Sequence, residues 1–75
     1  MSAGRPAVPA GPVREAPAGF VPQAGQERIL EEVLAGIDLG GYDRRIVAWM
    51  AGWDTSTVLT VASWIVRARD AGPGR

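Results

Sequence analysis

A joint between two helices is indicated by residues 47–58, which read Val47-Ala48-Trp49-Met50-Ala51-Gly52-Trp53-Asp54-Thr55-Ser56-Thr57-Val58. Ala48 supplies the small side chain needed where two helices cross, and Gly52, four residues later, can turn the chain with a positive φ. Trp53 follows at once and would fill the angle between the helices. Val58 and Val61 are three residues apart and would close the core beneath the turn. This spacing predicts that the chain changes direction sharply at Gly52.

Helices are predicted on both sides of this joint. On the N-terminal side, Asp43 offers an N-cap. The inward stripe of this helix would consist of Ile46, Val47, Met50 and Trp53. On the C-terminal side, Asp54 would cap a helix over residues 55–70, because polar side chains recur there every three or four residues without a two-residue alternation. The run Ala71-Gly72-Pro73 would end that helix.

A further helix is predicted upstream, over residues 26–35. Its apolar residues have the spacing of a helical stripe and are Ile29, Leu30, Val33 and Leu34. Gly36 is placed to end the helix in a left-handed conformation, and the two glycines at 40 and 41 indicate a turn. The fold class is therefore all-α, with a three-helix unit over residues 23–72 and a short tail over residues 73–75.

Residues 1–22 differ from the rest of the chain in composition. Five of the six Pro residues lie there, together with three Gly residues. Pro lacks a backbone donor and Gly loses the most entropy on ordering, so this segment is predicted to be a disordered, Pro/Gly-rich arm. Phe20 and Val21 are the only residues of the arm that we expect to dock on the folded part.

The composition of the 75-residue chain excludes most kinds of enzyme. The sequence contains no Cys, His or Lys. Disulfides, thiolate or imidazole metal ligands, a histidine general base and Schiff-base chemistry are therefore impossible. Glu31 and Glu32 are adjacent and point about 100° apart on a helix, so they do not form a carboxylate pair. We expect no catalytic activity, no cofactor and no metal site.

The run from Val47 to Val58 resembles the helix-turn-helix segment of small bacterial repressor-type DNA-binding proteins. In those proteins a Val-Ala pair, an Ala-Gly pair, a short polar cap and a Thr-Val pair recur with these gaps. The longer stretch 42–69 resembles short uncharacterised proteins of high-GC Gram-positive bacteria. The repressor resemblance implies a cytoplasmic DNA-binding or transcription-regulating protein that acts as a dimer and places its third helix in the major groove of duplex DNA.

The candidate DNA contacts lie on the two helices of the joint. Short hydroxyls on the expected outer face of the third helix would touch bases but discriminate weakly among them. Arginines at the helix ends would contact phosphates. The whole candidate set is Arg44, Arg45, Thr55, Ser56, Thr60, Ser63, Arg67 and Arg69.

A protein-interaction module on the same scaffold, without DNA binding, is the alternative. Trp49 and Trp64 lie at the borders of their helices' apolar stripes and would anchor a protein partner or a second copy, since Trp is enriched at interface hot spots. A membrane span is not expected. Residues 46–66 are long enough to cross a bilayer, but Asp54 lies near their centre, where a charge costs about 2.5–3.5 kcal/mol.

Overall fold

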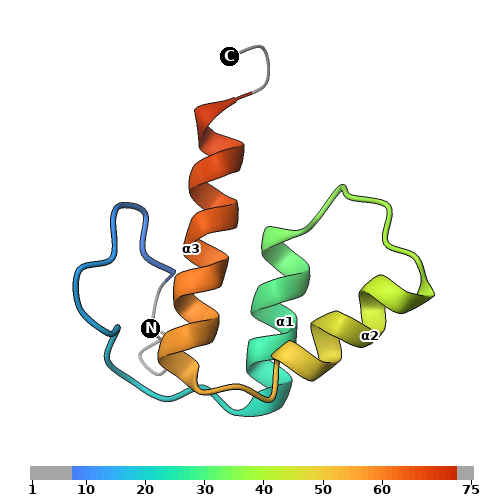
Figure 1. The fold of residues 1–75 in the computed structure, drawn as a ribbon, viewed down its shortest axis with the longest axis horizontal. Coiled ribbons are helices and arrows are strands. Elements are labelled where there is room, and N and C mark those ends of the chain that lie inside the picture. Colours follow the sequence, from blue (N-terminus) through green and yellow to red (C-terminus); the bar gives the residue numbers. More distant parts are fainter. Residues whose placement is uncertain (1–7, 73–75) are drawn as a thin grey trace, which may run out of the picture.

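The computed structural model describes residues 8–72, and within that range the chain forms three helices and no strand. They are α1 (Gln23–Val33), α2 (Gly41–Met50) and α3 (Thr55–Ala71). The predicted all-α class is confirmed. Helix α1 packs against both of the other helices, whereas α2 slants away from α3 (Figure 1).

The core consists of two clusters that share α1. One cluster is formed by Val21, Ile29, Leu59 and Ala62, and the other by Leu30, Val47, Ala51 and Val58. The neighbouring residues Ile29 and Leu30 therefore serve different clusters, because successive side chains on a helix point about 100° apart. Helix α1 is the central element, and both α2 and α3 pack against it.

The ends of α1 differ slightly from the predicted ones. The helix begins at Gln23, three residues earlier than expected, because Pro22 fits the position before a helix and its carbonyl accepts a hydrogen bond from Gln26 N at 2.9 Å. The C-terminal turn is completed by Gly36, which has φ of +90°. The predicted left-handed Gly36 is confirmed.

The predicted N-cap of α2 is wrong. The helix begins at Gly41, and the extended Gly40 precedes it, so Asp43 lies inside the first turn. Asp43 Oδ2 accepts a hydrogen bond from Gly40 N at 2.9 Å. A carboxylate in the first turn satisfies a free donor and suits the positive end of the helix dipole. Asp43 therefore stabilises the start of the helix from within its first turn, not from the N-cap position.

The turn between α2 and α3 differs from the predicted geometry. Ala51, not Ala48, is the fully buried small residue, and Ala48 is exposed. Gly52 is not among the residues of the described chain with positive φ. The chain turns instead through backbone hydrogen bonds between residues three apart, from Gly52 N to the Trp49 carbonyl and from Trp53 N to the Met50 carbonyl. Such tight helical turns need only negative φ.

Helix α3 has the predicted ends but a different buried face. Asp54 Oδ2 accepts a hydrogen bond from Thr57 N at 3.0 Å, so the predicted N-cap is confirmed. Gly72, with φ of +83°, ends the helix as expected. The buried residues of α3 are Thr55, Val58, Leu59, Ala62 and Ser63. Val58 is buried as predicted, but Val61 is only half-buried, because the face that packs on α1 is rotated by about one residue position.

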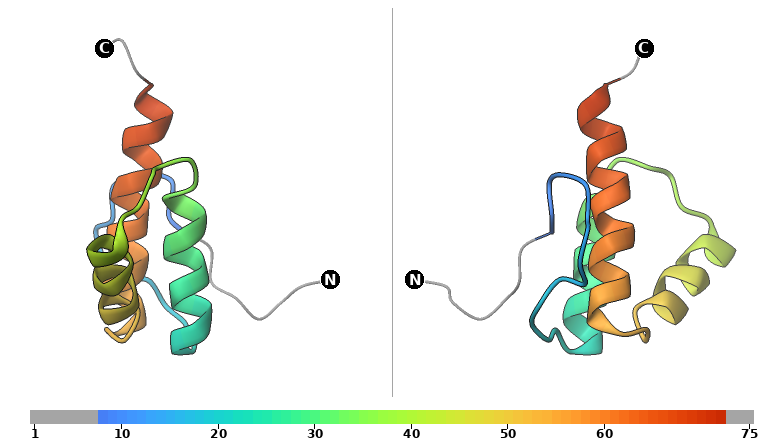
Figure 2. Two further views of the ribbon diagram at one scale, coloured as in Figure 1. Left: turned by 90° about the vertical axis from the view of Figure 1, so that its right-hand side faces the viewer. Right: turned by 60° about the vertical axis from the view of Figure 1, so that its left-hand side comes forward.

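The segment before α1 contains no helix or strand over residues 8–22, as expected of the Pro/Gly-rich arm. The arm runs along α3 on the side away from α2 (Figure 2). Val21 is buried as predicted, but Phe20 is exposed, so its expected docking is wrong. Val8 packs against the core instead. The parts of the predicted arm and tail in residues 1–7 and 73–75 lie outside the described residues.

Candidate functional site

Two of the eight candidate DNA-binding residues are buried, so their expected exposure is wrong. Thr55 donates its hydroxyl hydrogen to Gln26 Oε1 and accepts a hydrogen bond from Val21 N at 3.0 Å. Ser63 has no exposed surface, and its Oγ accepts a hydrogen bond from Arg67 Nε at 3.2 Å. Both residues lie on the face of α3 that packs inside the molecule, and neither hydroxyl is available to a ligand.

Ser56 and Thr60 are half-buried and already hydrogen-bonded. Ser56 Oγ donates to Asp54 Oδ2 at 2.7 Å, and Thr60 Oγ1 donates to the Ser56 carbonyl at 2.8 Å. Both residues also line a hollow of about 360 Å³ whose opposite side is formed by residues 13–16 of the arm. The side of α3 expected to read bases therefore faces the chain's own N-terminal segment.

The carboxylate of Asp54 is held in its charged form. Hydrogen bonds from the Ser56 hydroxyl, then from the Thr57 hydroxyl and backbone N–H, lower the pKa of Asp54 from 3.8 to about 2. These bonds all belong to the start of α3, and they employ both oxygens of the carboxylate. The residue is a helix cap that stays charged at physiological pH.

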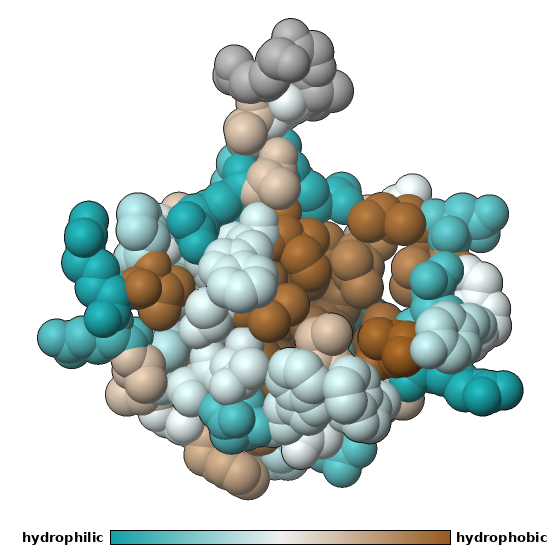
Figure 3. Space-filling model, in the orientation of Figure 1, coloured by the Kyte–Doolittle hydropathy of each residue, from teal (hydrophilic) through white to brown (hydrophobic). Residues whose placement is uncertain are grey.

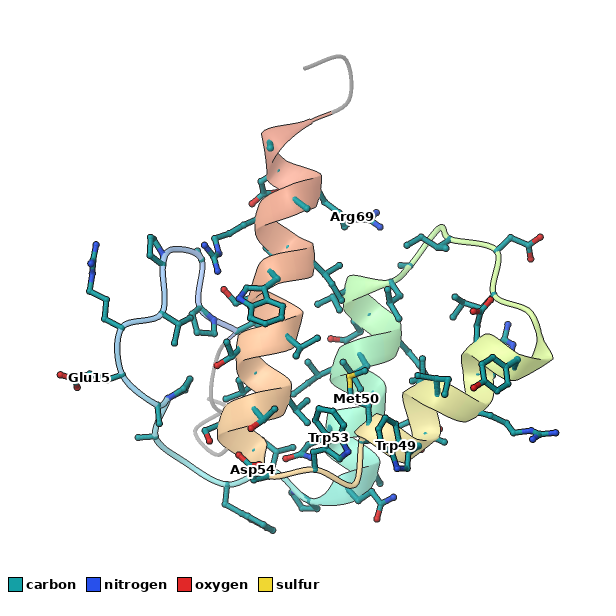
Figure 4. All side chains as sticks on the ribbon, viewed as in Figure 1. Glu15, Trp49, Met50, Trp53, Asp54 and Arg69 are labelled. Atoms are coloured by element: carbon teal, nitrogen blue, oxygen red, sulfur yellow. The ribbon has the colours of Figure 1, made fainter. Side chains whose placement is uncertain are left out.

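The arginines of the candidate set occupy different environments. Arg44 and Arg45 are exposed in the first turns of α2, and Arg44 borders a shallow hollow with Glu27 and Glu31. Arg69 is exposed near the end of α3 and points toward the segment that follows α1 (Figure 4). Its guanidinium lies 3.9 Å from the point where a Cβ on Gly36 would stand. This position lets Arg69 complement the negative end of the α1 dipole.

An apolar hollow lies between α2 and the α1–α3 pair. We call it the α2–α3 groove; it has a volume of about 290 Å³ and is lined by Leu30, Leu34, Leu39, Tyr42, Asp43, Ile46, Val47, Met50, Val61 and Ile65. Asp43 is the single charged residue of this lining. The groove forms the brown apolar region in the middle of the face shown in Figure 3. It exists because α2 packs on α1 and leaves the side of α3 that carries Val61 and Ile65 uncovered.

The tryptophans are exposed on or near this face. Trp49 and Trp53 pack edge to face, with ring centroids 4.8 Å apart and an interplanar angle of 79° (Figure 4). Trp53 is 38% exposed, so its predicted role in the core is wrong. Trp49 and Trp64 are 59% and 58% exposed, which agrees with their predicted position at the borders of the apolar stripes. They belong to different helices, Trp49 to α2 and Trp64 to the middle of α3.

Sequence reasoning missed the groove, although part of its signal was present. Tyr42, Ile46 and Met50 are spaced four residues apart, so one face of α2 carries three large apolar side chains in a row. Only Ile46 and Met50 were assigned to the inward stripe of that helix. The facing wall comes from α1 and α3, which are distant in sequence.

Within residues 8–72, no helix has the length and apolar character needed to cross a bilayer. The chain as a whole was compared with known proteins. No family model, curated protein or solved structure matches it.

Proposed function

We propose that this protein is a helical protein-interaction module whose α2–α3 groove receives the apolar side of an α-helix. The observation that carries the proposal is the lining of the groove, in which nine of ten residues are apolar or aromatic. Helices bind in such grooves through apolar residues at positions i, i+3, i+4 and i+7.

The size and form of the groove favour a helix over a small molecule. A volume of about 290 Å³ is at the lower end of pockets that enclose drug-sized ligands. Tyr42 and Asp43 are the only residues of the lining with polar side-chain atoms, and one oxygen of Asp43 already accepts a hydrogen bond from Gly40 N. Such a lining offers few groups to orient a small ligand. A few side chains from a passing helix would fill the groove and bury its walls, with a gain of about 25 cal/mol per Å² of apolar surface.

The rim of the groove carries large aromatic side chains. Tyr42 lines it and is 71% exposed, so much of this ring is available to a partner. Tyr and Trp combine large contact area with few rotatable bonds and dominate many interfaces. Leaving these rings in water on so small a chain has no benefit for folding, and an interface would cover them.

Binding of a labelled amphipathic helical peptide, with Leu at i, i+3, i+4 and i+7, tests this proposal by fluorescence anisotropy. We expect saturable binding that Tyr42→Glu weakens by at least about tenfold, as for a hot-spot residue. Trp49→Glu is the matched control: Trp49 is also an exposed aromatic residue of α2 but does not line the groove. Absence of saturable binding, or equal weakening by both substitutions, would contradict the proposal.

DNA binding with a role in transcription regulation is a second candidate function. The observation in its favour is the pair Arg44 and Arg45, both exposed in the first turns of α2. Two adjacent cations at a helix start can neutralise phosphates without reading bases. Anisotropy of a labelled DNA duplex at low and at physiological salt tests this candidate, because phosphate contacts weaken steeply with salt.

A further inference from the structure

We propose that the helix received by the α2–α3 groove is α3 of a second copy of this chain, so that two copies form an antiparallel α3–α3 pair. This inference rests on the proposed function of the groove and identifies its partner.

The first argument is the pattern of apolar residues on α3. Val61, Trp64, Ile65 and Ala68 have the spacing i, i+3, i+4 and i+7. Val61 and Ile65 line the groove, while Trp64 is 58% exposed and Ala68 is exposed. The anchor pattern that a groove of this kind requires is therefore displayed at its own edge. We call these four residues the α3 stripe.

The second argument is the length of α3. It has 17 residues and α1 has 11, a difference of about 9 Å at 1.5 Å per residue. Figure 1 shows the last turns of α3 standing clear beyond the end of α1. Ala68 and the residues after it lie on these projecting turns, and Ala68 to Ala71 are all exposed. The far half of the α3 stripe is therefore free to cover the surface of another molecule.

The third argument is self-complementarity. In a two-fold interface the same patch serves both subunits, so residue i of one copy faces residue j of the other and the reverse. An antiparallel crossing between Trp64 and Ile65 places Val61 of each copy opposite Ala68 of the other, a larger side chain against a small one. It also places Trp64 of each copy over Ile65 of the other, at the wall of the groove. Each of the four stripe residues then contacts the partner in both copies, so every contact occurs twice.

The fourth argument is charge. The chain has a formal net charge of zero, so two copies do not repel each other at long range. The α3 stripe itself contains no charged residue. Antiparallel pairing turns the end of each α3 that carries Arg67 and Arg69 toward the Asp54 end of the other, and it opposes the two helix dipoles. Asp43, which is exposed, is the single charged residue of the groove lining that the partner's α3 would approach.

Sedimentation equilibrium of the full chain, from about 1 μM to about 1 mM, tests the inference. We expect the mass to approach twice 7.9 kDa as the concentration rises. Trp64→Glu should raise the dimer dissociation constant by at least about tenfold, as expected for a central aromatic residue. Trp49→Glu should leave it unchanged, although the two tryptophans are equally exposed.

Two further variants complete the test. Ala68→Glu places a charge on the same stripe at an exposed position, and it should also dissociate the dimer if Trp64→Glu fails to fold. Tyr42→Glu should weaken the dimer because Tyr42 belongs to the groove. A dimer that resists Tyr42→Glu, or that Trp49→Glu weakens as much as Trp64→Glu, would overturn the inference.

A mass of 7.9 kDa at the highest concentration would overturn it as well. That result leaves the proposed function standing if the amphipathic peptide still binds to wild type and not to Tyr42→Glu. A chain that neither dimerises nor binds the peptide would contradict both proposals.

Discussion

The hydroxyl of Thr55 donates a hydrogen bond to the side-chain carbonyl of Gln26 across 2.5 Å, inside the molecule and 29 residues apart in sequence. Gln26 Nε2 donates in turn to the backbone carbonyls of Ala51 and Trp53, both at 2.8 Å. Thr55 also accepts from Val21 N. Gln26 of α1 thus holds the α2–α3 turn and the start of α3, and Thr55 links this network to the end of the arm. Among the described residues, no buried side-chain polar atom lacks a partner.

Replacing Gln26 should therefore destabilise the fold strongly. In Gln26→Leu, the carbonyls of Ala51 and Trp53 lose their side-chain donor, and the Thr55 hydroxyl keeps only its contact with Val21. The Ala51 carbonyl is then left without that donor in the interior, and an unpaired buried group costs about 1–3 kcal/mol. We expect a loss of at least about 2 kcal/mol in the free energy of unfolding, measured by urea denaturation. Gln23→Leu is the control, because Gln23 is in the same helix but exposed. Equal stability of the two variants would show that the network contributes little.

Acid should weaken the start of α3. The pKa of Asp54 is lowered from 3.8 to about 2 by hydrogen bonds from Ser56 and Thr57. The stabilisation that this carboxylate contributes is fully present above pH 3.8 and is lost as the pH falls toward 2, since protonation then favours the unfolded chain. Urea midpoints measured from pH 5 to pH 2 should fall more steeply in wild type than in Asp54→Asn. Asn retains a capping oxygen but does not titrate. Parallel curves for the two proteins would contradict this assignment.

The sequence predicts the helices better than their faces. The ends set by Gly36, Asp54 and Gly72 depend on local chemistry, and all three are correctly predicted. The buried face of α3 is not, because apolar residues occur nearly all around this helix. Val58, Leu59, Val61, Ala62, Ile65 and Val66 leave no single stripe for periodicity to select. Packing on α1 makes the choice, and Ser63 can be buried there because it is small and its oxygen accepts a hydrogen bond from Arg67.

The candidate site was also predictable from the sequence only where it depends on local patterns. The exposure of Trp49, Trp64, Arg44 and Arg45 follows from helix periodicity and agrees with the structure. The α2–α3 groove combines walls from three helices, so it depends on the angle at which α2 leaves α1. That angle is a property of packing between distant segments, and no local pattern specifies it.

The two glycines around α2 should respond differently to alanine. Gly36 has φ of +90°, a conformation that costs a residue with a Cβ about 1 kcal/mol or more. Gly52 has no positive φ, and a Cβ there would lie 3.4 Å from the Trp49 carbonyl oxygen, close to ordinary contact. We expect Gly36→Ala to lower the melting midpoint clearly and Gly52→Ala to change it little. The reverse order would mean that the turn after Met50, not the end of α1, needs the freedom of glycine.

If the protein binds duplex DNA, phosphate neutralisation must supply most of the affinity, because Thr55 and Ser63 are buried and Ser56 and Thr60 face the arm. Within the candidate set, the exposed cations are Arg44, Arg45 and Arg69. Three phosphate contacts give a slope of about −2.7 in a plot of log affinity against log salt, at about 0.9 per contact.

The double substitution of Arg44 and Arg45 by Ala should flatten this slope by about 1.8, since it removes two of those contacts. Arg28→Ala is the matched control, because Arg28 is an exposed arginine of α1 outside the candidate set. Ser56→Ala should leave the slope unchanged, because its hydroxyl is occupied by Asp54. A slope that all three variants change equally would show a diffuse charge effect without a defined binding face. Absence of duplex binding at about 50 mM salt, where such contacts are strongest, would leave the α2–α3 groove as the functional surface of the molecule.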